Sequence, residues 1–388
     1  MAASIGLNAR NGLRHFLVCA LVLGNNPCLA NEPKDLKPRL VNLDNVAAPP
    51  EFIPGTSGAL VTCYKTAQGP SYIGSIRDQP QVATLIDAAS GKVLKTIAIR
   101  GIPVVSSSGK IAFINQKEIS FCEPTTFKQS TKVNFSNKIR PHFSKFINQS
   151  TFMAVTIDEA FLIDSETGHC RKFLSEPGIL PTFVPSQDGK IISIENSLPN
   201  SETQIRFYNV EKGKFINTKV LRGFPQIAWS SKGHNCIYYS KSGHCIEQPI
   251  EAINWRDLDL SANSGPQSKD LSKLAQNKNS DKIAYQWDRD LIIERKGATP
   301  LTYKRLPMQV HTVEWNEAND LLLTGAGSEG FIITDDKMYK FPVGNMVYTE
   351  ARWIPKTRKI LLYDSEKQQL FLICPPLKTN QEQQSQHP

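Results

Sequence analysis

Phe183-VPSQDG-Lys190-IISI, residues 183–194, is the clearest copy of a pattern that specifies the architecture of this chain. An apolar anchor, Phe183, precedes a polar turn, and a β-branched apolar stretch follows the turn. A short apolar stretch bounded by turn residues is typical of a buried β-strand. The run therefore predicts two strands joined by a tight turn.

The same pattern recurs about every 40–50 residues along the chain, a spacing that marks a repeat architecture. Its copies begin at apolar anchors, namely Phe52, Val104, Phe146, Phe183, Trp229, Leu274, Trp315 and Trp353. Repeats of this length that carry strands instead of helices indicate a β-propeller or a related array.

A second signal follows several copies: an apolar run that ends in Asp or Asn, with Gly four residues later. It occurs at Asp87 and Gly91, at Asp164 and Gly168, and again at 209–213. The Asp or Asn side chain accepts backbone hydrogen bonds in such a turn, and Gly tolerates a positive φ. Each unit therefore predicts four antiparallel strands, which is one propeller blade.

We predict an all-β, single-ring β-propeller over residues 39–375. Eight anchors favour eight blades; seven is the alternative, because the first unit is long and its Phe52 copy could belong to a linker. The last unit offers only three strands, so Arg39–Leu43 is expected to supply the fourth. Closing the ring in this way removes an exposed sheet edge.

Two of these stretches resemble known repeats. FVPSQDGKIISI at 183–194 resembles the WD40-like repeat of propellers related to the periplasmic TolB protein, and LIDAASGKV at 85–93 resembles the turn of YVTN-type and quinoprotein-type propellers. The resemblance is at superfamily level and covers residues 39–375, although Leu274 replaces an aromatic anchor. It implies a ring of blades and does not specify a substrate.

The first 30 residues have the features of a signal peptide. Basic Arg10 and Arg14 precede the apolar run 16–24, and NNPCLA at 25–30 ends in a small residue. That apolar run is shorter than the ~20 residues needed to span a bilayer. The sequence therefore predicts export, to a periplasmic or secreted location.

Three polar segments lie outside the repeat. Residues 31–38 and the Gln-rich tail 376–388 are expected to be flexible or disordered, because they carry too little apolar surface to fold. Residues 256–281 are expected to form a polar insertion between the fifth and sixth units. A loop of that length acts either as a lid or partner-binding element, or as an insert without a role.

Charge and cysteine content restrict the partners. The formal charge is +9, but the basic residues are scattered through turns. We therefore expect no nucleic-acid binding, although a basic surface for acidic glycans stays open.

Disulfides are possible in an exported chain, and the candidate pairs are Cys236 with Cys245 and Cys63 with Cys374.

One segment carries side chains that could bind a metal. His234, Cys236, His244 and Cys245 form a weak candidate zinc site, set against a disulfide or two free thiols. Neighbouring strand residues point to opposite faces, which disfavours His244 and Cys245 as joint ligands. No metal or other cofactor is expected.

Catalytic motifs are scarce in this sequence. There is no G-x-S-x-G elbow, no haem-attachment motif and no calcium loop, and the Gly-rich run 324–330 is interpreted as a hairpin loop. Acids at strand ends could converge on a central channel. The candidates are Asp158, Glu195, Asp288, Glu314 and Glu350.

The sequence thus favours an exported, non-enzymatic binding or scaffolding protein whose partner is another protein or an envelope component. The alternative is a propeller-type enzyme or enzyme subunit, such as a lactonase-like hydrolase or the large subunit of an amine dehydrogenase-like complex. That alternative predicts that acids and amides from several blades meet in one site.

Overall fold

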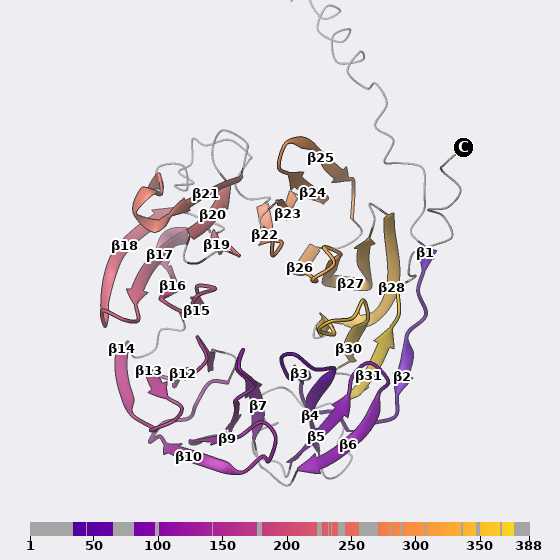
Figure 1. Ribbon diagram of the computed structural model, residues 1–388. Helices are drawn as coiled ribbons and strands as arrows, with labels where there is room; N and C mark the ends of the chain where they lie inside the picture. The colour runs from indigo at the N-terminus through magenta and orange to yellow at the C-terminus, as the bar shows by residue number, and fades with distance from the viewer. Residues whose placement is uncertain are drawn as a thin grey trace, which may run out of the picture. The chain divides into compact units, whose positions relative to one another are not determined.

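Eight small β-sheets succeed one another around an axis in the computed structural model (Figure 1). All described residues belong to one compact unit, Pro33–Pro388. They are 34–43, 45–64, 81–97, 101–141, 143–176, 181–222, 227–231, 233, 235–239, 245–255, 271–279, 281–287, 289–306, 309–334, 337–346, 350–364 and 367–375. The expected signal peptide, Asp288 and the tail 376–388 lie outside them.

We number the sheets as blades one to eight in chain order. The innermost strand of each blade is, in turn, β3 (Glu51–Phe52), β7 (Ile102–Val105), β11 (Lys145–Phe146), β15 (Thr182–Pro185), β19 (Ile227–Trp229), β22 (Leu271–Gln276), β26 (Gln309–Trp315) and β29 (Glu350–Trp353). Each of these strands contains one of the eight predicted anchors, which confirms the repeat and the favoured count of eight blades.

The second strands pair antiparallel to the first. They are β4 (Gly58–Tyr64), β8 (Ile111–Ile114), β12 (Thr151–Val155), β16 (Ile191–Leu198), β20 (Asn235–Tyr239), β23 (Lys282–Trp287), β27 (Leu321–Thr334) and β30 (Ile360–Asp364). The third strands are β5 (Gln81–Asp87), β9 (Glu118–Cys122), β13 (Glu159–Asp164), β17 (Glu202–Asn209), β21 (Cys245–Pro249), β24 (Asp290–Arg295), β28 (Lys337–Met346) and β31 (Gln369–Ile373).

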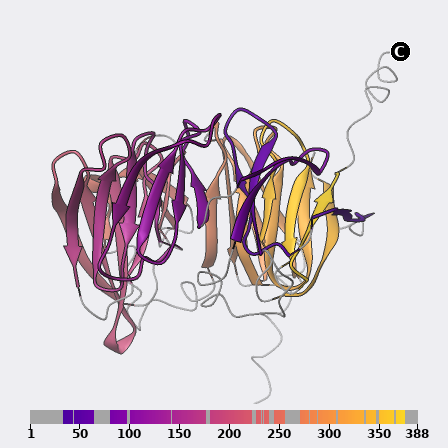
Figure 2. The same cartoon turned by 90° about the horizontal axis from the view of Figure 1, so that it is seen from below.

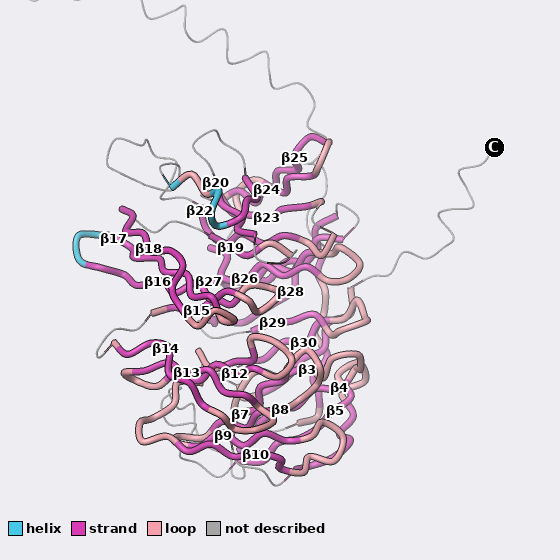
Figure 3. Tube along the Cα trace, turned by 60° about the vertical axis from the view of Figure 1, so that its left-hand side comes forward, coloured by secondary structure: helices cyan, strands magenta, loops and turns pink. Residues whose placement is uncertain are grey.

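Outer strands complete seven of the blades. They are β6 (Lys92–Ile97), β10 (Gln129–Asn134), β14 (Cys170–Ser175), β18 (Lys214–Arg222), β25 (Ala298–Tyr303), β1 (Lys34–Asp35) and β2 (Arg39–Val41). Within the described residues, blade five has three strands. Helical structure there is limited to short turns such as η3 (Pro199–Ser201), at the tip of the β16–β17 hairpin, and η4 (Ile250–Ala252) (Figure 3).

The N-terminal segment closes the ring, as predicted. Arg39, Leu40 and Val41 of β2 pair antiparallel with Leu372, Phe371 and Leu370 of β31, so blade eight joins the second strand of the chain to the last one. Figure 2 shows the sheets from the side, with the first and last coloured strands next to each other.

The expectation that residues 31–38 form no ordered structure is wrong for β1. Lys34 and Asp35 pair in parallel with Tyr339 and Lys340 of β28. The short segment needs little apolar surface of its own, because an existing strand edge supplies its hydrogen-bond partners and Leu36 packs onto the core between blades seven and eight.

Apolar side chains fill most of the spaces between neighbouring blades. Separate clusters of buried residues occupy seven of the interfaces; for example, Val61 of blade one packs with Leu361 and Leu372 of blade eight. Between blades five and six the described contacts include polar ones. Gln276 donates a hydrogen bond to Glu247 at 2.9 Å and accepts one from the Ser231 amide at 3.0 Å.

The predicted Asp-to-Gly turns have the expected geometry. In the turn after β13, Gly168 has φ +74° and its amide donates to the Asp164 carbonyl at 2.8 Å. The Asp164 carboxylate accepts the amides of Glu166 and Thr167 at 2.9 and 2.8 Å. These hydrogen bonds, led by that of Thr167, hold the pKa of Asp164 below its usual value.

Two sequence expectations about loops are wrong. The Gly-rich run 324–330 lies within β27, where Gly330 permits close packing: a Cβ at Gly330 would lie 2.3 Å from Cζ of Phe341. The polar insertion expected at 256–281 ends earlier, because Leu271–Gln276 form β22 and pair with β23. Residues 256–270 lie outside the described residues.

Candidate functional site

Charged side chains from four blades gather on the innermost strands. We call Glu51, Lys145, Glu314, Glu350 and Arg352 the axial cluster; they lie on β3, β11, β26 and β29, and all are half-buried. The three glutamates come from blades seven, eight and one, whereas Lys145 belongs to blade three.

The alternation of side chains along a strand explains why the cluster forms. Four of its five members directly precede an anchor: Glu51 precedes Phe52, Lys145 precedes Phe146, Glu314 precedes Trp315, and Arg352 precedes Trp353. Successive strand residues point to opposite faces. When the anchor packs between the blades, the preceding residue therefore turns away from that core.

The tryptophan anchors also fix the inner strands relative to one another. The indole N–H of Trp353 donates to the Glu314 carbonyl at 3.1 Å, and that of Trp315 donates to the Ala275 carbonyl at 3.2 Å. Each bond joins an innermost strand to that of the preceding blade. The backbones that carry Glu314 and Arg352 are thus held in register.

Arg352 is the residue of the axial cluster that interacts with all three of its glutamates. Its Nε lies 2.8 Å from Oε1 of Glu350. Burial by itself lowers the pKa of Arg352, but the attraction of Glu350, Glu51 and Glu314 together raises it above its ordinary value. The guanidinium thus stays charged and interacts with all three carboxyl groups.

Two glutamates of the cluster titrate near neutral pH. Burial raises the pKa of Glu51 to about 7, and repulsion from Glu350 adds to the effect; Arg352 and a hydrogen bond from the Val105 amide oppose it. Burial likewise raises the pKa of Glu314 to about 7, against the effects of Arg352 and a hydrogen bond from the Trp353 amide. The two carboxyl groups can therefore lose or gain protons between pH 6 and 8.

Lys145 is a cationic group in the same half-buried environment, and its pKa shifts in the opposite direction. Its pKa is lowered, first by burial and then by repulsion from Arg352. The axial cluster thus contains three acids and two bases. Its net charge becomes negative once Glu51 and Glu314 are both ionised.

The structure brings together two of the five acids predicted for a central site. Glu314 and Glu350 belong to the axial cluster, but Asp158 lies in the turn between β12 and β13, and Glu195 lies on β16, opposite Thr182 and outside the innermost strands. Asp288 lies outside the described residues. Glu51, Lys145 and Arg352 were missed, although the charged residue before each anchor was a usable signal.

Neither candidate disulfide is present in the structure, since none of Cys236, Cys245, Cys63 and Cys374 is joined to another cysteine. Strand register explains the first pair, because Cys236 lies opposite Gln248 and Cys245 lies opposite Tyr239. The cysteines are thus three positions apart along the ladder and on opposite faces. Cys63 packs within the core between blades eight and one, whereas Cys374 is exposed.

The structure describes only two of the four residues of the candidate zinc site, since His234 and His244 lie outside the described residues. In the described part of the chain, no group of three or more His, Cys, Asp or Glu side chains is arranged to hold a metal ion. No helix in that part is long and apolar enough to cross a membrane.

No protein-family model and no curated protein matches this sequence. Solved structures do resemble it. The C-terminal WD40 domain of Sif2 has a TM-score of 0.59 at 12% identity, covering 89% of this chain and 100% of that one. Sqt1 of Saccharomyces cerevisiae has a TM-score of 0.51 at 11% identity, with the same coverage.

The β-propeller domain of Cps50 (Swd1) of Myceliophteria thermophila has a TM-score of 0.52 at 9% identity, covering 87% of this chain and 100% of that domain. At such identities a likeness establishes architecture and leaves activity open. The chain has the fold of a WD40-like β-propeller.

Proposed function

We propose that this protein is an exported, non-enzymatic binding propeller that receives a cationic group of a partner protein at the axial cluster. The observation that carries the proposal is one arginine, Arg352, which pairs with Glu350 at 2.8 Å and also attracts the carboxyl groups of Glu51 and Glu314 on two other blades. A rigid ring holds these side chains in place before a partner arrives, which reduces the ordering cost of binding.

Charge supports a cationic ligand. Burial and repulsion from Glu350 disfavour ionisation of Glu51 and Glu314 in the free protein. An arriving ammonium or guanidinium stabilises both carboxylates, because an opposite charge within a few ångströms favours the ionised form. Binding should therefore strengthen as pH rises from 6 to 8.

Titration with tri-arginine tests the proposal. Glu51→Gln with Glu314→Gln removes two carboxylates and should weaken binding about tenfold at pH 8, at roughly threefold for each charge. Glu123→Gln with Glu211→Gln is the matched control, since both of those glutamates are exposed and outside the cluster. Equal affinity of the two double variants, or an affinity independent of pH, would refute axial binding.

Catalysis is the second candidate, favoured by one observation. Carboxyl groups with a pKa of about 7 can act as general acids or bases at neutral pH. Turnover of a lactone, sugar or amine, with calcium or quinone added, that is lost in Glu314→Gln would establish an enzyme. Binding of tri-arginine without turnover supports the binding protein.

Export is proposed on the features of residues 1–30. If the leader is removed, N-terminal sequencing of the mature protein from the producing cell should begin at Asn31. A mature protein that retains Arg10 and Arg14 would contradict it.

A further inference from the structure

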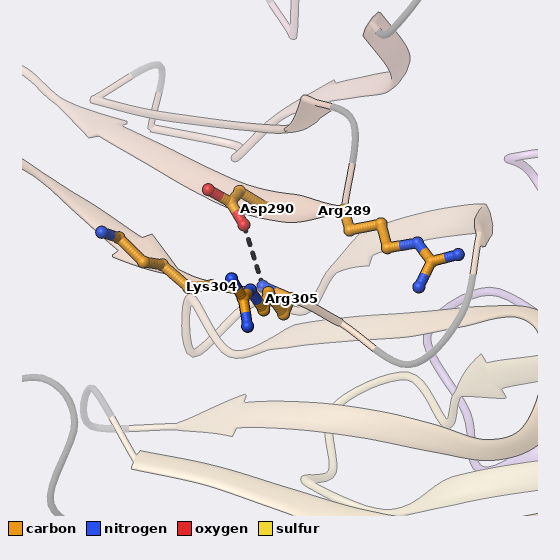
Figure 4. A pocket seen from close by; sticks show the side chains of 4 residues that line it. All are labelled: Arg289, Asp290, Lys304 and Arg305. Atoms are coloured by element: carbon orange, nitrogen blue, oxygen red, sulfur yellow. Dashed lines mark hydrogen bonds between the residues drawn. The ribbon is translucent and has the colours of Figure 1, made fainter.

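A second site lies at one end of blade six, on the turns that flank β24 and β25. An open pocket of about 530 Å³ is lined by Arg289, Asp290, Lys304 and Arg305 (Figure 4). Arg289 directly precedes β24, Asp290 is its first residue, and Lys304 and Arg305 follow β25. Three of these four described side chains are cationic.

Hydrogen bonds tie the two chain segments of this pocket together. The Arg305 amide donates to Oδ1 of Asp290 at 2.8 Å, and the Leu306 amide donates to the Arg289 carbonyl at 2.6 Å. Arg305 has φ +57°, in the left-handed region that is unfavourable for a residue with a side chain. The two bonds therefore hold a strained backbone that presents Arg305 between its neighbours.

The three cations have no acidic partner in the part of the chain that the structure describes. Arg289, Lys304 and Arg305 are exposed, and none of them is within salt-bridge distance of a described carboxylate. Figure 4 shows Lys304 and Arg289 extending in opposite directions, with Arg305 between them. The positive charge is thus spread across the pocket and is not focused on one point.

We propose that this blade-six pocket binds an extended ligand that carries two or more phosphate or sulfate groups. Guanidinium groups match such oxyanions through paired hydrogen bonds, and lysine adds a mobile charge. The pocket volume falls within the roughly 300–1,000 Å³ typical of small-ligand sites. The site is independent of the axial cluster and selects ligands of the opposite charge.

Calorimetric titration with inorganic phosphate, pyrophosphate and tripolyphosphate tests the site. Affinity should rise along this series and fall with added salt. The triple change Arg289→Gln, Lys304→Gln and Arg305→Gln should weaken tripolyphosphate binding on the order of 30-fold, at about threefold for each charge. A trisulfated disaccharide, run in parallel, distinguishes a sulfated ligand from a phosphorylated one.

A second triple variant controls for overall charge. Lys92→Gln, Lys214→Gln and Lys219→Gln remove the same charge from exposed positions on β6 and β18. Tripolyphosphate affinity should change less than about threefold in this control. Equal losses in the two triple variants, or no tripolyphosphate binding by the unaltered protein, would overturn the proposal.

Asp290→Asn tests the charge arrangement in the opposite direction. Asparagine keeps an oxygen to accept the Arg305 amide but removes the negative charge from the pocket. Tripolyphosphate affinity should increase about threefold. A decrease, with the fold intact by circular dichroism, would contradict the site, since the carboxylate would then support binding and not oppose it.

Discussion

At the scale of single residues, ionisation of two half-buried glutamates in the axial cluster destabilises the folded protein. Glu51 and Glu314 have a pKa of about 7 in the folded chain, against an ordinary value of 4.5. Between these two values the folded state binds more protons than the unfolded state. Stability contributed by these groups is therefore lost as pH rises through this window.

Replacing either glutamate should stabilise the protein at high pH only. Glu314→Gln should raise the free energy of unfolding by about 1 kcal/mol at pH 8, after allowance for solvent screening, and by much less at pH 5. Urea unfolding at the two pH values measures the difference. Equal changes at both pH values would mean that Glu314 is not shifted, and exposed Glu123→Gln supplies the baseline.

Site residues could be predicted only where the signal lies in neighbouring residues; contacts between strands far apart in the chain could not. Glu314 and Glu350 were identified as strand-end acids. Glu51 and Arg352 come together only because β2 and β31 close the ring, and a sequence period does not show which charged residues then face one another. The missed signal was local: a charge placed directly before an anchor.

At the scale of strands and turns, local chemistry predicted most of the fold. Apolar anchors and Asp-to-Gly turns depend on neighbouring residues, so the sequence displays them directly. Register does not. The candidate Cys236–Cys245 disulfide depended on a hairpin register that only the structure supplies, and that register places the two cysteines three positions apart.

Two turn glycines allow a matched test of backbone packing. Gly189 and Gly55 both follow an innermost strand, with φ +68° and +77°. A Cβ at Gly189 would lie 2.2 Å from the Ile147 carbonyl oxygen, whereas nothing lies within 4 Å at Gly55.

Gly55→Ala should therefore cost only the left-handed backbone penalty, about 1 kcal/mol. Gly189→Ala should cost about 3 kcal/mol or more, because the added methyl group also displaces the backbone of blade three. Thermal or urea unfolding of the two variants provides the comparison. Equal costs would place Ile147 away from the β15–β16 turn.

At the scale of the whole molecule, the ring depends on its N-terminal strand. Val41 on β2 is buried between blades eight and one, whereas its neighbour Leu40 is 52% exposed. The same substitution at these two positions separates the loss of ring closure from the loss of apolar surface.

Val41→Asp should lower the free energy of unfolding by about 3 kcal/mol or more, because it buries an unpaired carboxylate. Leu40→Asp should cost less than about 1 kcal/mol. Hydrogen exchange at Leu370–Ile373 should accelerate in Val41→Asp alone. Matching effects of the two variants would show that β2 is not the closing strand.

Carbon-13 NMR titration of Glu51 and Glu314 tests the ring and its axial cluster most directly. It gives the carboxyl pKa values of both residues in the unaltered protein and in Arg352→Gln. Blades one, seven and eight must meet for one arginine to act on both acids. We expect both groups to titrate near pH 7, and both pKa values to rise further when Arg352 loses its charge. Titration of both near 4.5, unaffected by Arg352→Gln, would contradict the ring and its axial site together.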